Sequence, residues 1–416
     1  MTAIKEHRIT LKNLGHIDPE SIDDYLARGG YDSLRKALQA THVEVIDALV
    51  ESSLRGRGGA GFSAGLKEKF TSESCLRCAQ KYMVCNADEG EPGTWKDRII
   101  MENDPHLLLE GMLIAAYAIG ATKAFIYLRA EYYKSTEIVA KAIDSARERG
   151  ILGKNIFGSN FSCDIEIRLG AGSYLCGEEL TLLESLEGKR GYPRIKPPFP
   201  AEKGLFGFPT LVNNVETLAT IPAIIGMGAD EYSKLGIPES PGTKIFTISG
   251  DVERPGFYEL EMGATLRQLI YDLAGGVKNK AELMAVLIGG AAGTFVDKTV
   301  LDTPMGYDSL KEKGAVLGSG AIMVLNNTRS LKMMLQSILE FFKHESCGKC
   351  VPCRVGTDRL VRMIEDINKD MEQGFTLDDM VEEAENIART SLCPLGQSPI
   401  LPLASLKRYF DDHFKS

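Results

Sequence analysis

The stretch Tyr82-Met-Val-Cys-Asn-Ala-Asp-Glu-Gly-Glu-Pro-Gly93 contains the strongest indication of the fold. Its apolar run at 82–85 predicts a buried strand, and the turn that follows carries Asp88, Glu89 and Glu91. Open α/β sheets place their ligands at the carboxyl ends of parallel strands. The stretch therefore predicts an α/β sheet with a polar ligand site directly after this strand, although an ordinary acidic surface turn would give the same local pattern.

Strand-like and helix-like segments alternate on both sides of this stretch. Further strands are predicted at 124–128 and 164–168, and helices at 105–120, 131–149, 177–186 and 213–226. Residues 1–54 read as polar helices, and 193–209, with its five prolines, reads as a rigid loop. Such alternation predicts a largely parallel sheet.

The pattern changes after residue 238. Strands are predicted at 244–249, 257–261, 284–288 and 321–325, with a helix at 266–273. This is a small α+β module of about 85 residues, a common domain size. From residue 330 onward the chain reads as helices separated by loops that contain cysteines.

Composition excludes several function classes. The chain has 416 residues with Lys+Arg 48 against Asp+Glu 57, a net charge of −9, so nucleic-acid binding is disfavoured. Its apolar stretches are shorter than the roughly 18 residues of a membrane span, and residues 1–7 lack the apolar core of a secretory signal. We therefore expect a soluble cytoplasmic protein. The sequence has no Walker A lysine loop and no G-x-S-x-G elbow that follows a predicted strand, which leaves phosphoryl transfer and triad hydrolysis without support.

Four of the nine cysteines form a metal-binding pattern. Cys347, Cys350 and Cys353 follow one another at intervals of three, and Cys393 precedes a proline. Structural zinc sites usually use paired CxxC motifs or CxxC with histidines, so this spacing favours a [4Fe–4S] cluster. A zinc site and three merely buried cysteines are the alternatives.

A separate Cys75-Leu-Arg-Cys78 could bind metal or form a redox pair, but no neighbouring thiol or histidine completes it. A polar surface loop is the favoured interpretation. The odd cysteine count also argues against a disulfide framework.

Two glycine-rich loops could bind a phosphate or a cofactor. The loop 56–61 fits G-x-G-x-x-G, but a helical segment precedes it where a dinucleotide fingerprint needs a strand. Its backbone N–H groups could still approach a phosphate, with positive charge from Arg55, Arg57 and Lys67. A flexible loop is the alternative. The second glycine-rich stretch, 170–177, lies between a predicted strand and a helix and is followed by Glu178 and Glu179.

Six motifs in this order resemble one known family over nearly the whole chain. They are Arg55-Gly-Arg-Gly-Gly-Ala-Gly-Phe62, Asn86-Ala-Asp-Glu-Gly-Glu-Pro-Gly93, Tyr174-Leu-Cys-Gly-Glu-Glu179, Lys196-Pro-Pro-Phe-Pro200, Asn213-Asn-Val-Glu-Thr217 and Glu345-Ser-Cys-Gly-Lys-Cys-Val-Pro-Cys353. The family is the flavin-bearing, NADH-oxidising, iron–sulfur subunit of respiratory complex I and of related soluble NAD-linked hydrogenases and dehydrogenases, including electron-bifurcating complexes.

The resemblance implies the domain organisation. After an N-terminal helical segment at 1–54 we expect a Rossmann-like domain for FMN and NADH at 55–238. A ubiquitin-like β-grasp (SLBB) domain at 239–329 and a helical bundle with the iron–sulfur cluster at 330–416 would follow.

The resemblance also implies site residues. FMN would be held by Gly56, Arg57, Gly58, Gly59, Lys67, Asn86, Asp88, Glu89, Tyr174, Gly177, Glu178, Asn213, Asn214 and Thr217. NADH would be held by Phe62, Phe70, Glu91, Glu179, Lys196 and Phe199, with Glu91 and Glu179 as the catalytic contacts and FMN itself taking the hydride. The [4Fe–4S] cluster would be held by Cys347, Cys350, Cys353 and Cys393.

These cofactors imply an oxidoreductase subunit that exchanges a hydride between NADH and FMN and passes single electrons to the cluster. Glu179 would repel a 2′-phosphate, which favours NAD(H) over NADP(H). The expected partners are a thioredoxin-like [2Fe–2S] subunit and a larger iron–sulfur or catalytic subunit that is a hydrogenase, a dehydrogenase or ferredoxin-linked.

Departures from the family pattern bear on which complex this subunit belongs to. Phe62-Ser-Ala-Gly65 stands where complex I usually has Phe-Pro-Thr-Gly, and residues 392–410 resemble the soluble branch more closely. We therefore favour a soluble multisubunit complex, with the peripheral arm of complex I as the alternative. A flavin-free electron adaptor is the alternative from another functional class.

Overall fold

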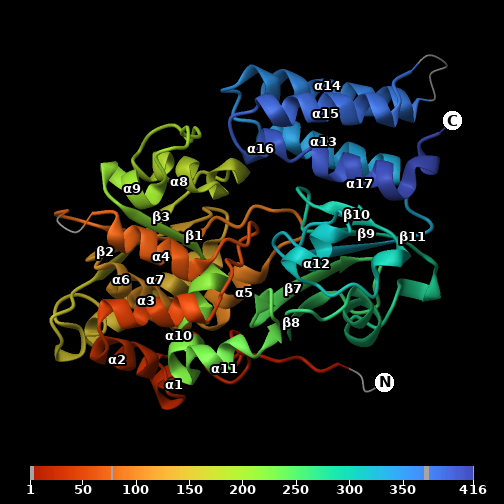
Figure 1. The fold of residues 1–416 in the computed structure, drawn as a ribbon. Helices are drawn as coiled ribbons and strands as arrows, with labels where there is room; N and C mark the ends of the chain where they lie inside the picture. Colours follow the sequence, from red (N-terminus) through yellow and green to blue (C-terminus); the bar gives the residue numbers. More distant parts are fainter. Residues whose placement is uncertain (1–3, 76–77, 370–373, 416) are drawn as a thin grey trace.

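The computed structural model describes residues 4–75, 78–369 and 374–415. Figure 1 shows three parts: a sheet surrounded by the N-terminal helices, a second sheet beside it, and a bundle of C-terminal helices. In the described ranges we find no helix that combines the length and the apolar character required to cross a membrane.

The first sheet is wholly parallel, with strand order β3-β2-β1-β4. Its strands are β1 (Tyr82–Ala87), β2 (Lys123–Leu128), β3 (Asp164–Leu169) and β4 (Thr210–Asn214). The sequence predicted the first three and missed β4, because its short apolar run ends in two asparagines that read as the start of a helix. The helix predicted at 213–226 begins instead at Val215.

Both faces of this sheet are buried, as parallel sheets require. Met83, Cys85 and Ala87 of β1 pack into the larger core with α6 (Pro105–Ile119) and α10 (Val215–Met227). Val84 faces the other way, into a smaller cluster with α8 (Glu179–Leu186). The alternation along the strand fixes its register, and α7 (Tyr133–Glu148) borders β3.

The N-terminal residues form helices within 1–54, as the sequence predicted. They are α1 (Ile22–Ala27), α2 (Asp32–Gln39) and α3 (His42–Glu51), and the following helix α4 (Ala64–Glu73) was not predicted. Ser21 caps α1, and Thr41 with Glu44 forms a capping box on α3.

Two further helices form where sequence patterns predicted a loop or no element. The prediction that 193–209 holds no element was wrong, because Pro200 starts α9 (Pro200–Lys203), where its missing N–H is harmless. The helix α5 (Lys96–Asn103), after the carboxylate turn, was not predicted. The short α11 (Ala229–Ser233) leads from α10 into the second sheet.

The second sheet has the order β10-β9-β11-β7-β8, in which only the central pair β7–β11 is parallel. Its strands are β7 (Thr243–Gly250), β8 (Gly256–Glu261), β9 (Leu283–Ile288), β10 (Thr294–Val296) and β11 (Ala321–Asn326). Four of them confirm the sequence predictions, and the helix predicted at 266–273 is a π-helical turn over Gln268–Leu273. The short β10 and α12 (Tyr307–Glu312) were missed. A two-stranded ribbon, β5 (Gly236–Ile237) and β6 (Ser240–Pro241), precedes β7.

The C-terminal bundle contains α13 (Leu331–Glu345), α14 (Val351–Asn368), α15 (Leu377–Thr390), α16 (Pro394–Gln397) and α17 (Ile400–Phe410). Leu335, Leu360 and Leu403 belong to one apolar core that also takes in Phe295 of β10. The backbone N–H of Phe295 donates to the Ser405 hydroxyl at 2.9 Å, which ties α17 to the second sheet. The bundle therefore rests directly on that sheet (Figure 1).

Candidate functional site

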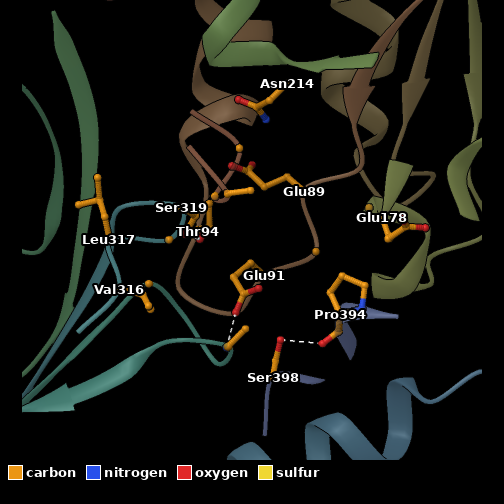
Figure 2. A pocket seen from close by; sticks show the side chains of 18 of the residues that line it. Glu89, Glu91, Thr94, Glu178, Asn214, Val316, Leu317, Ser319, Pro394 and Ser398 are labelled. Atoms are coloured by element: carbon orange, nitrogen blue, oxygen red, sulfur yellow. Dashed lines mark hydrogen bonds between the residues drawn. The ribbon is translucent and has the colours of Figure 1, made fainter. Parts of the chain in front are cut away.

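A cavity of about 720 Å³ lies where the three parts of the chain meet (Figure 2). Its wall comes from the glycine loop after α3, the turn after β1, the 3-10 turn η2 (Tyr174–Gly177), loops of the second sheet and the start of α16. Of the predicted residues, it is lined by Gly58, Gly59, Asn86, Asp88, Glu89, Glu91, Tyr174, Gly177, Glu178 and Asn214. The remaining predicted FMN residues, all within the described ranges, do not line it: Gly56, Arg57, Lys67, Asn213 and Thr217.

The glycine loop packs closely against Asn214 of β4 and Tyr307 of α12, and its glycines allow this approach. A Cβ on Gly61 would come within 2.4 Å of the Tyr307 ring, and one on Gly58 would lie 3.0 Å from the Asn214 Cβ. Gly61 also has φ +65°, in the region that glycine adopts readily. The Tyr307 hydroxyl donates to the carbonyl of Gly56 at 2.8 Å. The contacts with Tyr307 thus hold the loop in place, while Gly58 and Gly59 line the cavity.

Arg57 does not send its side chain toward the cavity. The guanidinium is fully buried and donates to the carbonyl of Pro241 at 2.7 Å, while the backbone N–H donates to the Thr217 hydroxyl at 2.8 Å. The Arg57 side chain therefore joins the first sheet's domain to the ribbon before β7, and Thr217 holds the loop backbone. Their predicted contact with FMN remains a prediction.

A buried cluster of charges lies behind the cavity, and the sequence patterns did not predict it. The Lys96 ammonium is 2.6 Å from Asp97 Oδ1 and 2.9 Å from Glu216 Oε2, and the Lys244 ammonium of β7 is 3.3 Å from the same Glu216 oxygen. Glu216 also accepts the backbone N–H of Ile245 at 2.8 Å. Burial lowers the pKa of Lys244 to about 7, although Glu216 opposes this shift.

Two members of this cluster, Lys96 and Asp97, line the cavity. The one feature of the sequence that could have pointed to these two residues is that they are a pair of opposite charges shortly after the carboxylate turn. Charge pairs at a helix start usually face solvent, so this signal alone could not indicate burial.

Asp88 offers an unsatisfied carboxyl group to a ligand. Both carboxyl oxygens are buried and find no hydrogen-bond partner among the described residues, and the nearest cation, Arg129 Nη1, is 3.8 Å away. Burial raises the pKa of Asp88 to about 7, with Arg129 acting in the opposite direction. Such a group can accept from, or donate to, ligand hydroxyls.

Glu89 has partners within the chain. Its carboxylate accepts the backbone N–H groups of Asp97 at 2.9 Å and Arg98 at 3.1 Å, so it holds the first turn of α5. Burial, with the neighbouring Asp97 charge, raises the pKa of Glu89 to about 7. The structure thus gives Glu89 an anchoring contact in addition to its place on the cavity wall.

Two asparagines close the ends of neighbouring strands. The register pairs Asn86 of β1 with Asn214 of β4. The Asn86 amide donates to the carbonyl of Gly177 at 2.8 Å, and the Asn214 side-chain oxygen caps α10 by accepting from Glu216 N–H at 3.0 Å. Asn213, one residue earlier, keeps a buried Nδ2 without a partner in the described part of the chain. The amides therefore link the two strand ends to η2 and to α10.

Glu91 and Tyr174 bind each other across the cavity. The Tyr174 hydroxyl donates to Glu91 Oε2 at 2.5 Å, and Glu91 Oε1 accepts the backbone N–H of Ala292 at 3.0 Å. Figure 2 shows Glu91 between the turn after β1 and the loop of the second sheet. Burial raises the pKa of Glu91 despite these hydrogen bonds.

Of the polar residues predicted for NADH, Glu91 lines this cavity, whereas Glu179 and Lys196 come together outside it. Glu179 is 2.8 Å from the ammonium groups of both Lys67 and Lys196, and Lys196 is 3.3 Å from Glu178. Burial alone would raise the pKa of Glu179, but the two lysines outweigh it and lower the pKa to about 2. Glu179 is therefore a carboxylate over the whole physiological pH range.

The three aromatic residues predicted for NADH are half exposed. Phe62 and Phe199 each expose 53% of their surface and Phe70 exposes 50%. Large apolar rings left accessible near a charged group are suited to stacking on a planar ligand.

The four predicted cluster cysteines gather at the base of the bundle. Cys350 directly precedes α14, Cys353 lies in its first turn, and Cys393 directly precedes α16. Cys353 and Cys393 belong to one apolar cluster, and Cys347 and Cys350 pack against it. Burial, with a smaller contribution from negative charge on the other three cysteines, raises the pKa of Cys353 to about 11. Among the described residues, no set of three or more His, Cys, Asp or Glu side chains forms a site for a single metal ion.

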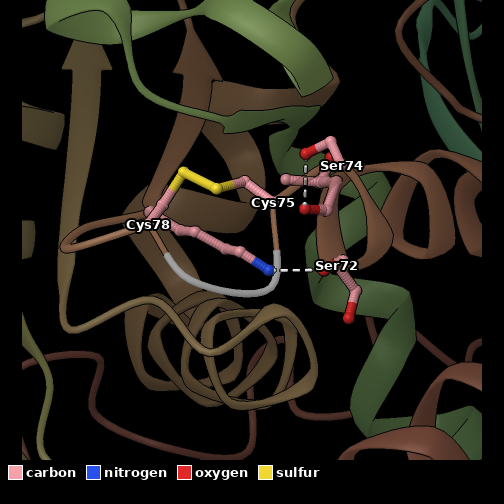
Figure 3. The surroundings of a disulfide bond; sticks show 6 residues. Ser72, Ser74, Cys75 and Cys78 are labelled. Atoms are coloured by element: carbon pink, nitrogen blue, oxygen red, sulfur yellow. Dashed lines mark hydrogen bonds between the residues drawn. A yellow bond between two sulfur atoms is a disulfide. The ribbon is translucent and has the colours of Figure 1, made fainter.

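Cys75 and Cys78 form a disulfide between α4 and β1 (Figure 3). The Lys81 ammonium, three residues after Cys78, donates to the carbonyl of Ser72 in α4 at 2.5 Å. The polar-loop interpretation missed this bond, because spacing alone did not favour pairing over two free thiols.

The residues fit the two cofactors that the sequence implies. The unpartnered Asp88 carboxyl and the glycine cradle at Gly58 suit the hydroxyls and phosphate of FMN. Four cysteines with no other ligand type suit an iron–sulfur cluster. Pro394 and Leu395, which directly follow Cys393, line the same cavity as Asp88 and Gly58, so the two sites adjoin.

Three family models match the chain. Residues 49–223 match the Nuo51 FMN-binding domain, 245–291 the SLBB domain, and 333–416 the NADH-ubiquinone oxidoreductase-F iron–sulfur binding region. These matches cover the first sheet, most of β7 and all of β8 and β9 in the second sheet, and the bundle.

Known proteins are similar over almost the full chain. The NADP-reducing hydrogenase subunit HndC of Solidesulfovibrio fructosivorans is 45% identical over 100% of this chain and 84% of its own length. The F subunit of the NADH-quinone oxidoreductase of Aquifex aeolicus is 48% identical over 90% of this chain and 86% of its own length. The crystal structure of an NAD+-reducing [NiFe]-hydrogenase superposes with a TM-score of 0.83 at 35% identity, over 98% of this chain and 66% of that one.

Proposed function

This chain belongs to the family of FMN- and [4Fe–4S]-binding oxidoreductase subunits that includes the F subunit of NADH-quinone oxidoreductase, and from that premise we propose that it exchanges a hydride with NAD(H). We propose further that it passes single electrons to its cluster within a soluble multisubunit redox complex. The observation that carries the proposal is the common wall of the two sites. The glycine loop and Asp88 face the same cavity as Pro394, the neighbour of Cys393.

When bound, FMN can take two electrons as a hydride and give them up one at a time. The chain's own residues supply position and charge. Gly58 and Gly59 let the backbone approach a phosphate, and Asp88 offers a carboxyl group that is protonated in part near pH 7. Asn86 and Tyr174 line the cavity beside Asp88 and would orient the remainder of the flavin.

We propose that the coenzyme is NAD(H) and that Glu179 selects it. Its carboxylate remains ionised and would repel a 2′-phosphate while accepting hydrogen bonds from ribose hydroxyls. Lys67 and Lys196 partly neutralise this charge, so the discrimination is expected to be moderate. One relative is an NADP-reducing hydrogenase subunit, which makes this choice worth measuring.

We propose the domain division at 1–54, 55–238, 239–329 and 330–416. The main apolar cores of the first sheet, the second sheet and the bundle support the boundaries after 238 and after 329, whereas residues 1–54 share the core of the first sheet. The relatives are subunits of larger assemblies, and we infer that this chain also has partner subunits. A thioredoxin-like [2Fe–2S] subunit and a larger iron–sulfur or catalytic subunit in the cytoplasm are the proposed surroundings. The peripheral arm of complex I is the second candidate, favoured by the similarity to the NADH-quinone oxidoreductase of Aquifex aeolicus. The flavin-free adaptor loses its support, because the chain contains the FMN-binding domain.

An anaerobic NADH titration of the FMN- and iron-reconstituted chain tests the proposed function. We expect flavin bleaching in the visible spectrum, together with the electron paramagnetic resonance signal of a reduced cluster. A chain that takes up no flavin, or whose bound flavin NADH does not reduce, would refute the hydride step.

Two cysteine variants separate the flavin from the cluster. In Cys393→Ser we expect normal flavin bleaching with loss of the cluster signal and of bound iron. Cys163→Ser is the matched control, because this free thiol is buried in the core of the first domain. It should retain both signals. An intact cluster signal in Cys393→Ser would contradict the assigned ligand set.

A further inference from the structure

Glu345 connects the cluster domain to the wall of the flavin cavity. It is the last residue of α13 and stands two positions before Cys347. Its Oε2 accepts the backbone N–H of Tyr174 at 2.9 Å, although the two residues are 171 positions apart in sequence. A carboxylate from the bundle therefore holds the first residue of η2, which lines the cavity.

A second contact from the same helix supports this hydrogen bond. Phe341 lies one helical turn before Glu345, on the same face of α13. Its ring meets the Tyr174 ring edge to face, with 5.0 Å between the ring centres. The backbone and the side chain of Tyr174 are thus both held by α13.

Tyr174 also has a fixed opposite end. Its hydroxyl donates to Glu91 at 2.5 Å, and Glu91 accepts the Ala292 N–H of the second sheet at 3.0 Å. The series Ala292, Glu91, Tyr174 and Glu345 is therefore a continuous hydrogen-bonded connection through all three parts of the chain. The negative charge of Glu345 also reaches the cavity, since it is one of the charges that raise the pKa of the buried Asp88.

We propose that Glu345 is a positioning residue that sets the separation between the flavin-binding wall and the cysteine loop. The inference rests on the proposed function, because it concerns electron transfer from flavin to cluster. Glu345 acts through the backbone of Tyr174 and through the short segment to Cys347. Electron transfer slows steeply with distance, so a small displacement of η2 should affect that step more than the hydride step.

Stopped-flow measurement of the reconstituted chain with NADH tests the inference by following flavin and cluster separately. In Glu345→Ala we expect the flavin to bleach at the wild-type rate and the cluster to be reduced about tenfold more slowly, which is less than the roughly 100-fold that a 1 Å misplacement at a reactive site can cost. Glu345→Gln retains an oxygen acceptor for the Tyr174 N–H and should restore most of the cluster rate. Equal cluster rates in wild type and Glu345→Ala would overturn the inference, and a glutamine variant as slow as the alanine variant would assign the effect to charge instead.

A readout independent of turnover is hydrogen exchange of the Tyr174 amide. We expect faster exchange in Glu345→Ala than in wild type or Glu345→Gln, and unchanged exchange would overturn the inference. Glu340→Ala is the matched control on the same helix, because its exposed side chain bonds only to Gln336, at 2.8 Å, in the described hydrogen-bond network. It should alter neither the exchange nor the cluster rate. Failure of the proposed function would appear separately, as an absence of flavin bleaching in the wild type.

Discussion

Glutamine in place of Glu216 removes the carboxylate that lies between two buried ammonium groups. The side chains of Glu216, Lys96 and Lys244 are each no more than 1% exposed. Glutamine keeps an oxygen for the Ile245 N–H, so the change removes charge and leaves the shape nearly intact. Lys96 keeps Asp97 at 2.6 Å, but Lys244 is left with the carbonyl of Arg57 at 3.2 Å.

The expected loss of stability follows from that uncompensated charge. Removing one member of a buried ion pair costs about 3–5 kcal/mol. Lys244 already has a pKa of about 7 in the folded chain, below its unfolded value, so the unfolded chain binds more protons and stability rises with pH above 7. Loss of Glu216 lowers that pKa further. The deficit of the variant relative to wild type should therefore be largest below pH 7 and should shrink as Lys244 becomes neutral in both proteins.

Urea unfolding followed by tryptophan fluorescence is a suitable assay. The chain has a single tryptophan, Trp95, directly before Lys96, so the signal reports on this cluster. The double variant Glu216→Gln with Lys244→Met should recover part of the loss, with a coupling energy of about 1–3 kcal/mol.

The control is Glu231→Gln, whose pair with Lys234 is more than 60% exposed on both sides. It should change the free energy of unfolding by less than about 0.5 kcal/mol. A loss in Glu216→Gln that is no larger than in this control, or one that does not change with pH, would refute the reasoning.

Three further outcomes are expected. Glu179→Gln should raise NADPH use relative to NADH, measured as the ratio of kcat/KM values, because the charge that opposes a 2′-phosphate is lost; an unchanged ratio would contradict this role. Burial raises the pKa of Asp88 to about 7, so the folded apo chain binds more protons than the unfolded chain between pH 4 and pH 7, and the stability that this group contributes is lost as pH rises through 7. Asp88→Asn should flatten that part of the stability profile in denaturant titrations, whereas an identical profile would count against a buried carboxyl. Alkylation of the unfolded chain without reductant should label all cysteines except Cys75 and Cys78, and labelling of those two before reduction would show that the disulfide is absent.

Local patterns predicted most of the strands and the cluster cysteines. The apolar run of β1 and the carboxylates that follow it are contiguous, and the intervals among Cys347, Cys350 and Cys353 are set by a short loop. Family resemblance extended this reading to FMN and NADH, and the family matches confirm the cofactors. The individual FMN and NADH contacts remain predictions.

Other features could not be read locally. β4 is short and ends in asparagines, so only its pairing with β1 identifies it as a strand. The burial of Lys96 depends on Glu216 and on the approach of Lys244 from a different domain. Arg57, in a loop that suggests phosphate binding, turns its side chain toward Pro241 instead.

The sequence by itself determined which chemical groups this protein has, because ligand type, spacing and strand pattern are local properties of the chain. Only the tertiary structure decided which of those groups face one another. The hydrogen bond from Tyr174 to Glu345 joins residues 171 positions apart, and the salt bridge from Lys96 to Glu216 joins two helices of the first domain. Such contacts arise when elements far apart in the sequence pack together, and burial then sets the charge state of each group through the cost of removing it from water.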